Sequence, residues 1–333
     1  MSGRPKVAVI GTGGTISSFG RGPFDTQDYV AAGDMGDAAR ILDTFPAVRE
    51  LAEIVPVAFP AVPSTQIAWP EWAALAETIE RMTAQDPDLS GVVILHGTAT
   101  MEETAYALDL TLRTDRTVVL TGAQRPSSAL SADGGMNLAA AIRTAGAPEA
   151  RGLGVLLVMN DEIHAAREVA KTSLWRMQTF RTPDFGVLGH VDGDAVAIYR
   201  RPVRARGGVP AFDRALLDDP PRVDVAYAYA GADGTAVRAF AAAGAEGIVS
   251  AGLAPGLTPP AEWEALAEAA ASGIAVVQSS RAGSGRTVAM TRHREAGILP
   301  ADNLTPQKAR ILLALALASG ADHAGVARLF AEC

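Results

Sequence analysis

Short runs of apolar, β-branched residues recur along the chain, and the first two are followed by glycine-rich turns. They are Val7–Ile10, which Gly11 follows, and Val92–Leu95. Runs of this kind are typical of parallel strands that are buried on both faces of a sheet. Apolar residues at helical spacing lie between them, as over residues 69–82. The alternation over residues 6–157 therefore predicts an α/β domain with a parallel sheet.

The alternation stops between Arg201 and Arg222, where Arg, Gly, Asp and Pro dominate, and a second α/β pattern begins at Val223. A chain of 333 residues exceeds what one hydrophobic core usually supports. We therefore predict an N-terminal α/β catalytic domain over residues 1–202, a linker over 203–222 and a C-terminal α/β domain over 223–333. Residues 187–201 add strand and turn features to the first domain.

The charge of the chain and its cysteine and histidine content argue against several kinds of partner and site. The net charge of −8 argues against a nucleic acid or an anionic membrane surface as partner, since both select basic proteins. The one cysteine is the last residue, and the five histidines show no ligand spacing, so no metal site is expected. The sequence also lacks a signal-peptide pattern and any apolar run near the ~20 residues of a membrane span. We expect a soluble cytoplasmic protein.

Threonine-rich turns follow the first two predicted strands. Their sequences are Gly-Thr-Gly-Gly-Thr-Ile over residues 11–16 and His-Gly-Thr-Ala-Thr over 96–100. Ligands of open α/β sheets bind at the carboxyl ends of the strands, so both turns are expected to face one pocket. Thr15 lies within a glycine-rich turn, which lets the backbone approach a substrate closely. The Gly-, Ser-, Asp- and Pro-rich segment 17–34 predicts a loop that can close as a lid.

A threonine hydroxyl needs a base or a lowered pKa to act as a nucleophile. Lys171 is the best candidate partner, because it follows a strand and a partly desolvated lysine can accept a proton from a hydroxyl. Thr100 and Glu103 fit a capping box, which would place Thr98 at a helix N-terminus where backbone N–H groups favour negative charge. This constellation predicts acyl transfer from an amide or ester.

Simpler interpretations apply to single residues. The glycine-rich turn also fits a phosphate loop or a plain tight turn, although Ile16 replaces the third glycine of a dinucleotide fingerprint and a Walker lysine is missing. His96 is more typical of a buried, hydrogen-bonded histidine than of a base. Asp133 is expected to cap a helix that runs through Leu138 and Ile142.

Several motifs, in the same order and across nearly the whole chain, resemble those of the bacterial-type L-asparaginases. They are residues 12–16, 96–105, 122–126, 131–134, 158–161, 169–172, 247–252 and 306–310. The resemblance implies a larger N-terminal parallel-sheet domain and a smaller C-terminal α/β domain. It also implies a homotetramer of intimate dimers, with active sites at the dimer interface, and no cofactor.

The resemblance also implies roles for individual residues. Thr15 would be the nucleophile that forms an acyl-enzyme and releases ammonia, Thr98 and Lys171 would form a second catalytic group, and Tyr29 matches the lid tyrosine. Backbone N–H groups near Thr98 and Ala99 would hold the oxyanion. Ser64 matches the serine that holds the substrate α-carboxylate. The residues expected to bind the substrate are Ser64, Thr65, Gly97, Ala99 and Gly14.

The chain departs from the family pattern where the family binds the α-ammonium of asparagine. Ala99 replaces the aspartate of the His-Gly-Thr-Asp-Thr motif, and Pro255 stands where an asparagine is expected. After Ser64 the family usually has a polar residue and then an aspartate, where this chain has Thr65 and Gln66. Only Glu295 could match the glutamate that the family lends across its interface. Burying an ammonium without a carboxylate is costly. We therefore predict hydrolysis of a small amide that lacks a free α-amino group: a half-amide, an N-substituted amide or a cyclic imide or lactam.

Three alternatives remain open from the sequence. The first is an ordinary cytoplasmic L-asparaginase that releases L-aspartate and ammonia, with another group in place of the missing aspartate. The second is a non-catalytic ligand-binding or sensor protein, although such a module has no use for a threonine–lysine pair. The third is a transamidation subunit that feeds ammonia to a partner, but it would need tRNA and the chain shows no basic face.

Overall fold

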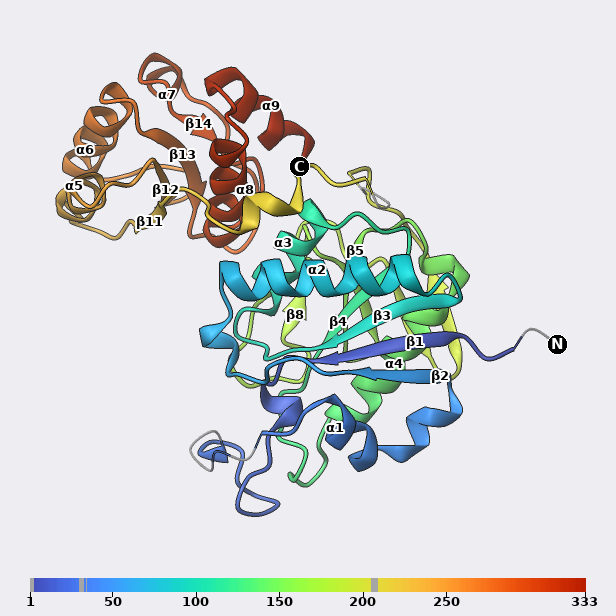
Figure 1. The fold of residues 1–333 in the computed structure, drawn as a ribbon. Coiled ribbons are helices and arrows are strands. Elements are labelled where there is room, and N and C mark those ends of the chain that lie inside the picture. The colour runs from blue at the N-terminus through green and yellow to red at the C-terminus, as the bar shows by residue number, and fades with distance from the viewer. Residues whose placement is uncertain (1–2, 30–32, 34, 205–208) are drawn as a thin grey trace. The chain divides into compact units, whose positions relative to one another are not determined.

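The computed structural model describes residues 3–29, 33, 35–204 and 209–333. The chain divides into two compact units, Met1–Pro210 and Ala211–Cys333, which Figure 1 shows from blue to yellow and from yellow to red. The expected lid includes residues 30–32 and 34, and the expected linker includes 205–208, all of which lie outside the described residues. The described part of that linker contains a short 3-10 helix, η6 (Arg214–Leu217).

The first unit is built on a mixed sheet, which has eight strands in the described residues, in the order β10-β9-β6-β5-β4-β3-β1-β2. The strands are β1 (Lys6–Gly11), β2 (Glu53–Val57), β3 (Leu89–Leu95), β4 (Thr117–Thr121), β5 (Val155–Met159), β6 (Glu162–Ala165), β9 (Gly189–Asp192) and β10 (Ala195–Ile198). The first five strands pair in parallel, and β6, β9 and β10 extend the sheet in antiparallel pairing. A separate antiparallel pair joins β7 (Ala170–Lys171) to β8 (Phe180–Arg181). The parallel strands predicted from the apolar runs are confirmed.

Helices cover both faces of this sheet, and Figure 1 shows α2 across its front and α4 behind it. Alternate residues of the buried strands, such as Val9 and Val93, pack in one core cluster with Leu138 and Ile142. The helices are α1 (Ala38–Thr44), α2 (Trp69–Gln85), α3 (Met101–Thr111) and α4 (Gly134–Gly146), with short 3-10 helices η1 (Thr15–Ser17), η3 (Pro46–Glu50), η4 (Ser64–Gln66) and η5 (Pro148–Ala150). Helices thus cover both faces of the sheet in the described residues (Figure 1), and open α/β sheets bind ligands at their strand ends.

The second unit is also a parallel sheet covered by helices, and it is smaller than the first. Its parallel sheet has the order β11-β12-β13-β14. The elements are β11 (Val223–Tyr227), α5 (Thr235–Ala242), β12 (Gly247–Gly252), α6 (Pro260–Ala271), β13 (Ala275–Ser280), α7 (Thr291–Glu295), β14 (Leu299–Pro300), α8 (Pro306–Ala318) and α9 (His323–Glu332). Val237 and Leu266 pack α5 and α6 against Ile248 and Val276, and α8 lies on the opposite side (Figure 1). The predicted fold of a larger N-terminal and a smaller C-terminal α/β domain is confirmed.

Two helix caps predicted from local spacing are wrong. The Thr100 side chain does not cap α3, because its hydroxyl donates instead to the Ser64 carbonyl oxygen at 2.8 Å. The Asp133 carboxylate does not cap α4, because it accepts the backbone N–H groups of Gln124 and Arg125. The Thr100 hydroxyl therefore ties the start of α3 to η4, and the Asp133 carboxylate ties the start of α4 to the turn that follows β4.

In the described part of the chain, no helix combines the length and the apolar character that a membrane crossing requires.

Candidate active site

The turns that follow β1 and β3 are in direct contact at the carboxyl ends of the two strands. The backbone N–H and the hydroxyl of Thr12 both donate to the Leu95 carbonyl, at 2.9 and 3.0 Å. A Cβ added to Gly14 would lie 2.2 Å from the Gly97 Cα, and Gly14 has a φ of 86°. A Cβ added to Gly97 would lie 2.6 Å from the Ser64 Oγ. Only glycine allows this approach at both positions, which brings the two threonine turns and Ser64 together.

Thr15 begins the short helix η1, and its hydroxyl lies 2.8 Å from the phenol oxygen of Tyr29. Either hydroxyl can donate, so the phenol can take the proton of Thr15 or give one to its oxygen. The intervening loop is fixed from the side by the segment 127–130. Ser128 Oγ accepts the Gly20 N–H at 2.8 Å, and the Leu130 N–H donates to the Pro23 carbonyl at 2.8 Å. The start of the expected lid is therefore tied to the body of the unit.

Thr98 and Lys171 form a close pair across the site. The Lys171 Nζ lies 2.5 Å from the Thr98 Oγ1 and 3.4 Å from the Gln124 Oε1. Burial lowers the pKa of Lys171 to about 8, and the nearby Glu102 carboxylate opposes that change. Roughly a tenth of the lysine is then neutral at pH 7, far more than for a solvated lysine. The pair can accept a proton from a hydroxyl or a water molecule near neutral pH.

The sequence reasoning missed two side chains that contact Lys171. The Glu102 carboxylate, buried in the first turn of α3, accepts the Lys171 backbone N–H at 3.2 Å. Gln124, in the turn that follows β4, contacts the Lys171 amine. Both residues lie within motifs that carry the family resemblance, but no local spacing connects either of them to Lys171. Only the pairing of distant strands brings them there.

His96 is fully buried beside these turns, as predicted, and its hydrogen bonds fix its tautomer. The Gly97 carbonyl can only accept, so the His96 Nδ1, which lies 2.8 Å away, carries the proton and donates to it. In the neutral ring the Nε2 then accepts the Thr104 hydroxyl at 2.9 Å. The Trp72 Nε1–H donates to the same Thr104 Oγ1 at 2.9 Å. Burial lowers the pKa of His96 to about 4, so the ring is neutral and acts as a fixed support.

The remaining predicted site residues differ in exposure. Ser64 is buried in η4, whereas Thr65 is exposed in the same turn. Ala99 is exposed at the turn that leads into α3. Glu295 is an exposed residue of α7 in the second unit.

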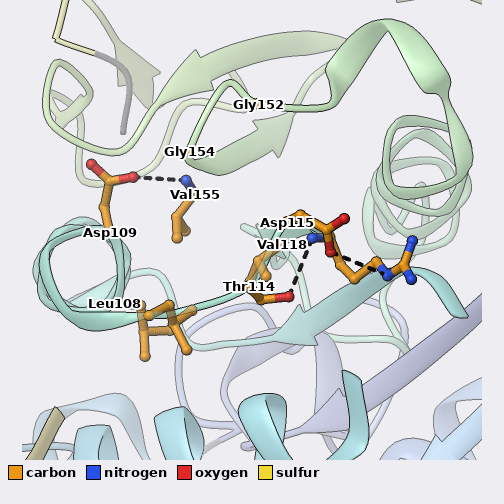
Figure 2. A pocket seen from close by; sticks show the side chains of 10 residues that line it. Leu108, Asp109, Thr114, Asp115, Val118, Gly152, Gly154 and Val155 are labelled. Carbon is orange, nitrogen blue, oxygen red and sulfur yellow. Dashed lines mark hydrogen bonds and ion pairs between the residues drawn. The ribbon is translucent and has the colours of Figure 1, made fainter. Parts of the chain in front are cut away.

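A pocket at the other end of the sheet contains none of these residues. It lies where β4 and β5 begin, and Val118, Val155, Asp109 and Thr114 are among its lining residues (Figure 2). The Asp109 carboxylate accepts the Val155 N–H there at 2.8 Å. The chemistry of the chain is concentrated at the opposite, carboxyl ends of the strands, where open α/β sheets bind their ligands.

Comparison with known proteins decides the family. Residues 6–204 match the family model described as Asparaginase, N-terminal, and residues 222–330 match the Glutaminase/Asparaginase C-terminal domain. The chain belongs to the asparaginase family. It is therefore an amidohydrolase that acts on C–N bonds, and the family resemblance of its motifs is confirmed.

Similar proteins span nearly the same length. The chain is 36% identical to L-asparaginase 2 of Bacillus subtilis over 98% of this chain and 86% of that protein. It is 34% identical to a glutaminase-asparaginase of Pseudomonas fluorescens biotype A, over 98% of this chain and 90% of that protein. Among solved structures, a probable cytoplasmic L-asparaginase from Campylobacter jejuni superposes with a TM-score of 0.94 at 36% identity, covering 99% of this chain and 100% of that one.

Proposed function

We propose that this amidohydrolase cleaves a small amide that lacks a free α-amino group. One observation carries the proposal: Ala99, which directly follows Thr98, presents an exposed methyl group where the family motif has an aspartate for the substrate ammonium. An ammonium bound there would lack that carboxylate, which is costly in a partly buried site. A substrate without a free α-amino group avoids this cost.

In the proposed reaction the Thr15 oxygen attacks the amide carbon, and the Tyr29 phenol lies in position to relay the hydroxyl proton. Backbone N–H groups near Thr98 and Ala99 hold the oxyanion, and such donors contribute about 3 kcal/mol each. The C–N bond then breaks, the nitrogen takes up a proton, and ammonia leaves an ester on Thr15. Water, deprotonated by the Thr98–Lys171 pair, attacks the ester, which releases a carboxylic acid and frees the hydroxyl.

Ammonia release from asparagine, succinamate, maleamate and N-acylated asparagine tests the proposal. We expect kcat/KM for at least one of the last three compounds to exceed that for asparagine. Thr15→Ala and Lys171→Met should each lose most activity, whereas the control variants Thr291→Ala and Lys6→Met should keep it. Efficient turnover of asparagine alone would contradict the substrate class, and an active Thr15→Ala variant would contradict the nucleophile.

A second candidate is an ordinary L-asparaginase that releases L-aspartate and ammonia. The names of the relatives favour it, and the Glu102 carboxylate is a nearby anion that could serve a positively charged substrate. In that case Glu102→Gln should raise KM for asparagine while leaving KM for succinamate unchanged. The two proposals thus give opposite orders of substrates in one assay.

We also propose a cytoplasmic homotetramer built from intimate dimers. Large apolar side chains on the surface of the first unit support an assembly, among them Leu174 and Trp175, which are 82% and 62% exposed between β7 and β8. The name of the Campylobacter jejuni neighbour supports the location. Light scattering coupled to size-exclusion chromatography measures the assembly, and a monomeric mass at working concentration would contradict it.

A further inference from the structure

We propose that Gln124 is the positioning residue that holds the Lys171 amine against Thr98 in a chain whose position 99 offers no carboxylate. The proposal rests on the proposed catalytic role of the Thr98–Lys171 pair. It goes further in one respect. In the family motif an aspartate at position 99, in the β3–α3 turn, supports the lysine, whereas here we assign that support to the neutral side chain of Gln124, which follows β4. Three features of the structure carry it: the contact, the fixation of Gln124 and the charge of its surroundings.

The contact defines which way the Gln124 amide points. Its Oε1 lies 3.4 Å from the Lys171 Nζ, and the Thr98 Oγ1 lies 2.5 Å from the same nitrogen. A lysine ammonium offers only donors, so the carbonyl oxygen of the amide, rather than its NH₂ group, must face it. The amine is thus held by two acceptors from different elements: a hydroxyl from the turn after β3 and an amide from the turn after β4.

Gln124 is itself fixed by the fold. The Asp133 carboxylate accepts the Gln124 N–H at 2.9 Å and the Arg125 N–H at 2.9 Å. The Asn137 side chain bridges the same carboxylate at 3.1 Å and the Gly122 carbonyl at 2.9 Å. These bonds hold the start of α4 against the turn that carries Gln124. A side chain placed by a pinned turn can orient its neighbour at little entropic cost.

The charge around Lys171 explains why an amide suits this position. Among the described neighbours, Glu102 on α3 is the charged group that faces the lysine, and it already stabilises the ammonium. The other groups against the amine are uncharged: Thr98, Gln124 and the Phe180 ring, whose centre is 5.8 Å from the Nζ. A second carboxylate would keep the lysine protonated. An amide orients the amine and leaves the neutral form accessible, consistent with a pKa of about 8.

Two substitutions at Gln124 separate orientation from charge. Gln124→Met keeps the length of the side chain and removes the acceptor, while Gln124→Glu keeps an acceptor and adds a charge. The matched controls are Gln85→Met and Gln85→Glu, at the exposed end of α2. Steady-state kinetics from about pH 6 to pH 10 give kcat and KM. The pH dependence of Lys171 acylation by acetic anhydride, read by mass spectrometry, reports its pKa without requiring turnover.

We expect Gln124→Met to lower kcat at least about tenfold with KM little changed, and to move the acylation midpoint of Lys171 to lower pH. Gln124→Glu should move that midpoint, and the rising limb of kcat, to higher pH by about one unit. The Gln85 variants should match the wild type. Thermal unfolding shows whether each variant is folded. If one Gln124 variant does not fold, the acylation midpoint of Lys171 in the other variant still tests the positioning role.

The outcomes separate the two proposals. An active Thr15→Ala variant would refute the proposed function, whatever Gln124 does. Folded Gln124 variants with wild-type kcat and an unmoved acylation midpoint would overturn the positioning role, even if Thr15→Ala is inactive. A third outcome would also overturn the positioning role: Gln124→Met loses activity, but the acylation midpoint of Lys171 moves in neither Gln124→Met nor Gln124→Glu. A purely structural defect would give that result.

Discussion

Acidification is expected to destabilise this protein through His96, the fully buried histidine that follows β3. Its Nδ1–H donates to the Gly97 carbonyl, and its Nε2 accepts the Thr104 hydroxyl. Protonation of Nε2 would remove the acceptor of the Thr104 hydroxyl and place a charge in a fully buried site. Burial therefore lowers the pKa of His96 from 6.5 to about 4. The neutral ring also fixes the Gly97–Thr98 peptide, whose N–H points away from its carbonyl.

The sign and size of the effect follow from the two pKa values. Between pH 6.5 and about 4 the unfolded chain binds a proton at His96 that the folded chain does not, so stability falls as the pH falls. The loss from this one group should reach about 2 kcal/mol at pH 5 and roughly 3 kcal/mol below pH 4. That is a large share of the stability of an ordinary domain.

The measurement compares urea unfolding of the wild type and of His96→Asn at a series of pH values, followed by tryptophan fluorescence. The asparagine Nδ2 occupies the place of the His96 Nδ1, so it can donate to Gly97, and it does not titrate. Carboxylates titrate equally in both proteins. The wild type should therefore lose about 2 kcal/mol more than the variant between pH 7 and pH 5. Parallel pH dependence in the two proteins would refute the assignment of a neutral, buried His96.

Two further substitutions test how the threonine turns are joined. Gly14→Ala should abolish most activity and lower the melting temperature, because its Cβ would lie 2.2 Å from the Gly97 Cα, whereas Gly22→Ala, at a position with nothing within 4 Å, should match the wild type. Thr100→Val removes the hydroxyl that donates to the Ser64 carbonyl and should raise KM severalfold, in line with about 1 kcal/mol for one hydrogen bond. The control variant Thr44→Val also loses a hydroxyl that donates to a backbone carbonyl, and it should leave KM unchanged. An equal change of KM in Thr44→Val and Thr100→Val would contradict a role for Thr100 at the site.

The parallel strands and the meeting of the two threonine turns could be predicted because they depend on strong local signals. Four apolar residues followed by a glycine-rich turn have few stable alternatives to a buried strand. The pairing of Gly11 with Leu95 then brings their turns together. Pro56 lies in the edge strand β2, where a residue that cannot donate to a neighbouring strand is tolerated.

The two cap predictions failed because each side chain has a partner outside the helix that it precedes. Thr100 and Glu103 have capping-box spacing, but the hydroxyl of Thr100 finds a carbonyl 36 positions earlier. The pairing of β7, only two residues long, with β8 has no periodic signal to reveal it. Local spacing therefore predicted candidate groups that the fold brings into contact, such as Thr98 and Lys171, while the contacts of Glu102 and Gln124 with Lys171 became visible only in the fold.

The reactive groups and the side chains that hold them come from different segments, so substrate specificity can change while the proposed catalytic groups stay in place. Thr15, Thr98 and Lys171 come from three separate chain segments, and each is held by its own contacts: Tyr29, the β3–α3 turn and the Gln124 amide. Removing a carboxylate at position 99 removes one anion for the substrate, but it does not release the lysine, because an acceptor from the turn after β4 still holds it. A chain built in this way can exchange the part that recognises the substrate while the hydroxyls and the amine keep their geometry. The same separation predicts that restoring an aspartate by Ala99→Asp should change the order of substrates more than it changes the best kcat.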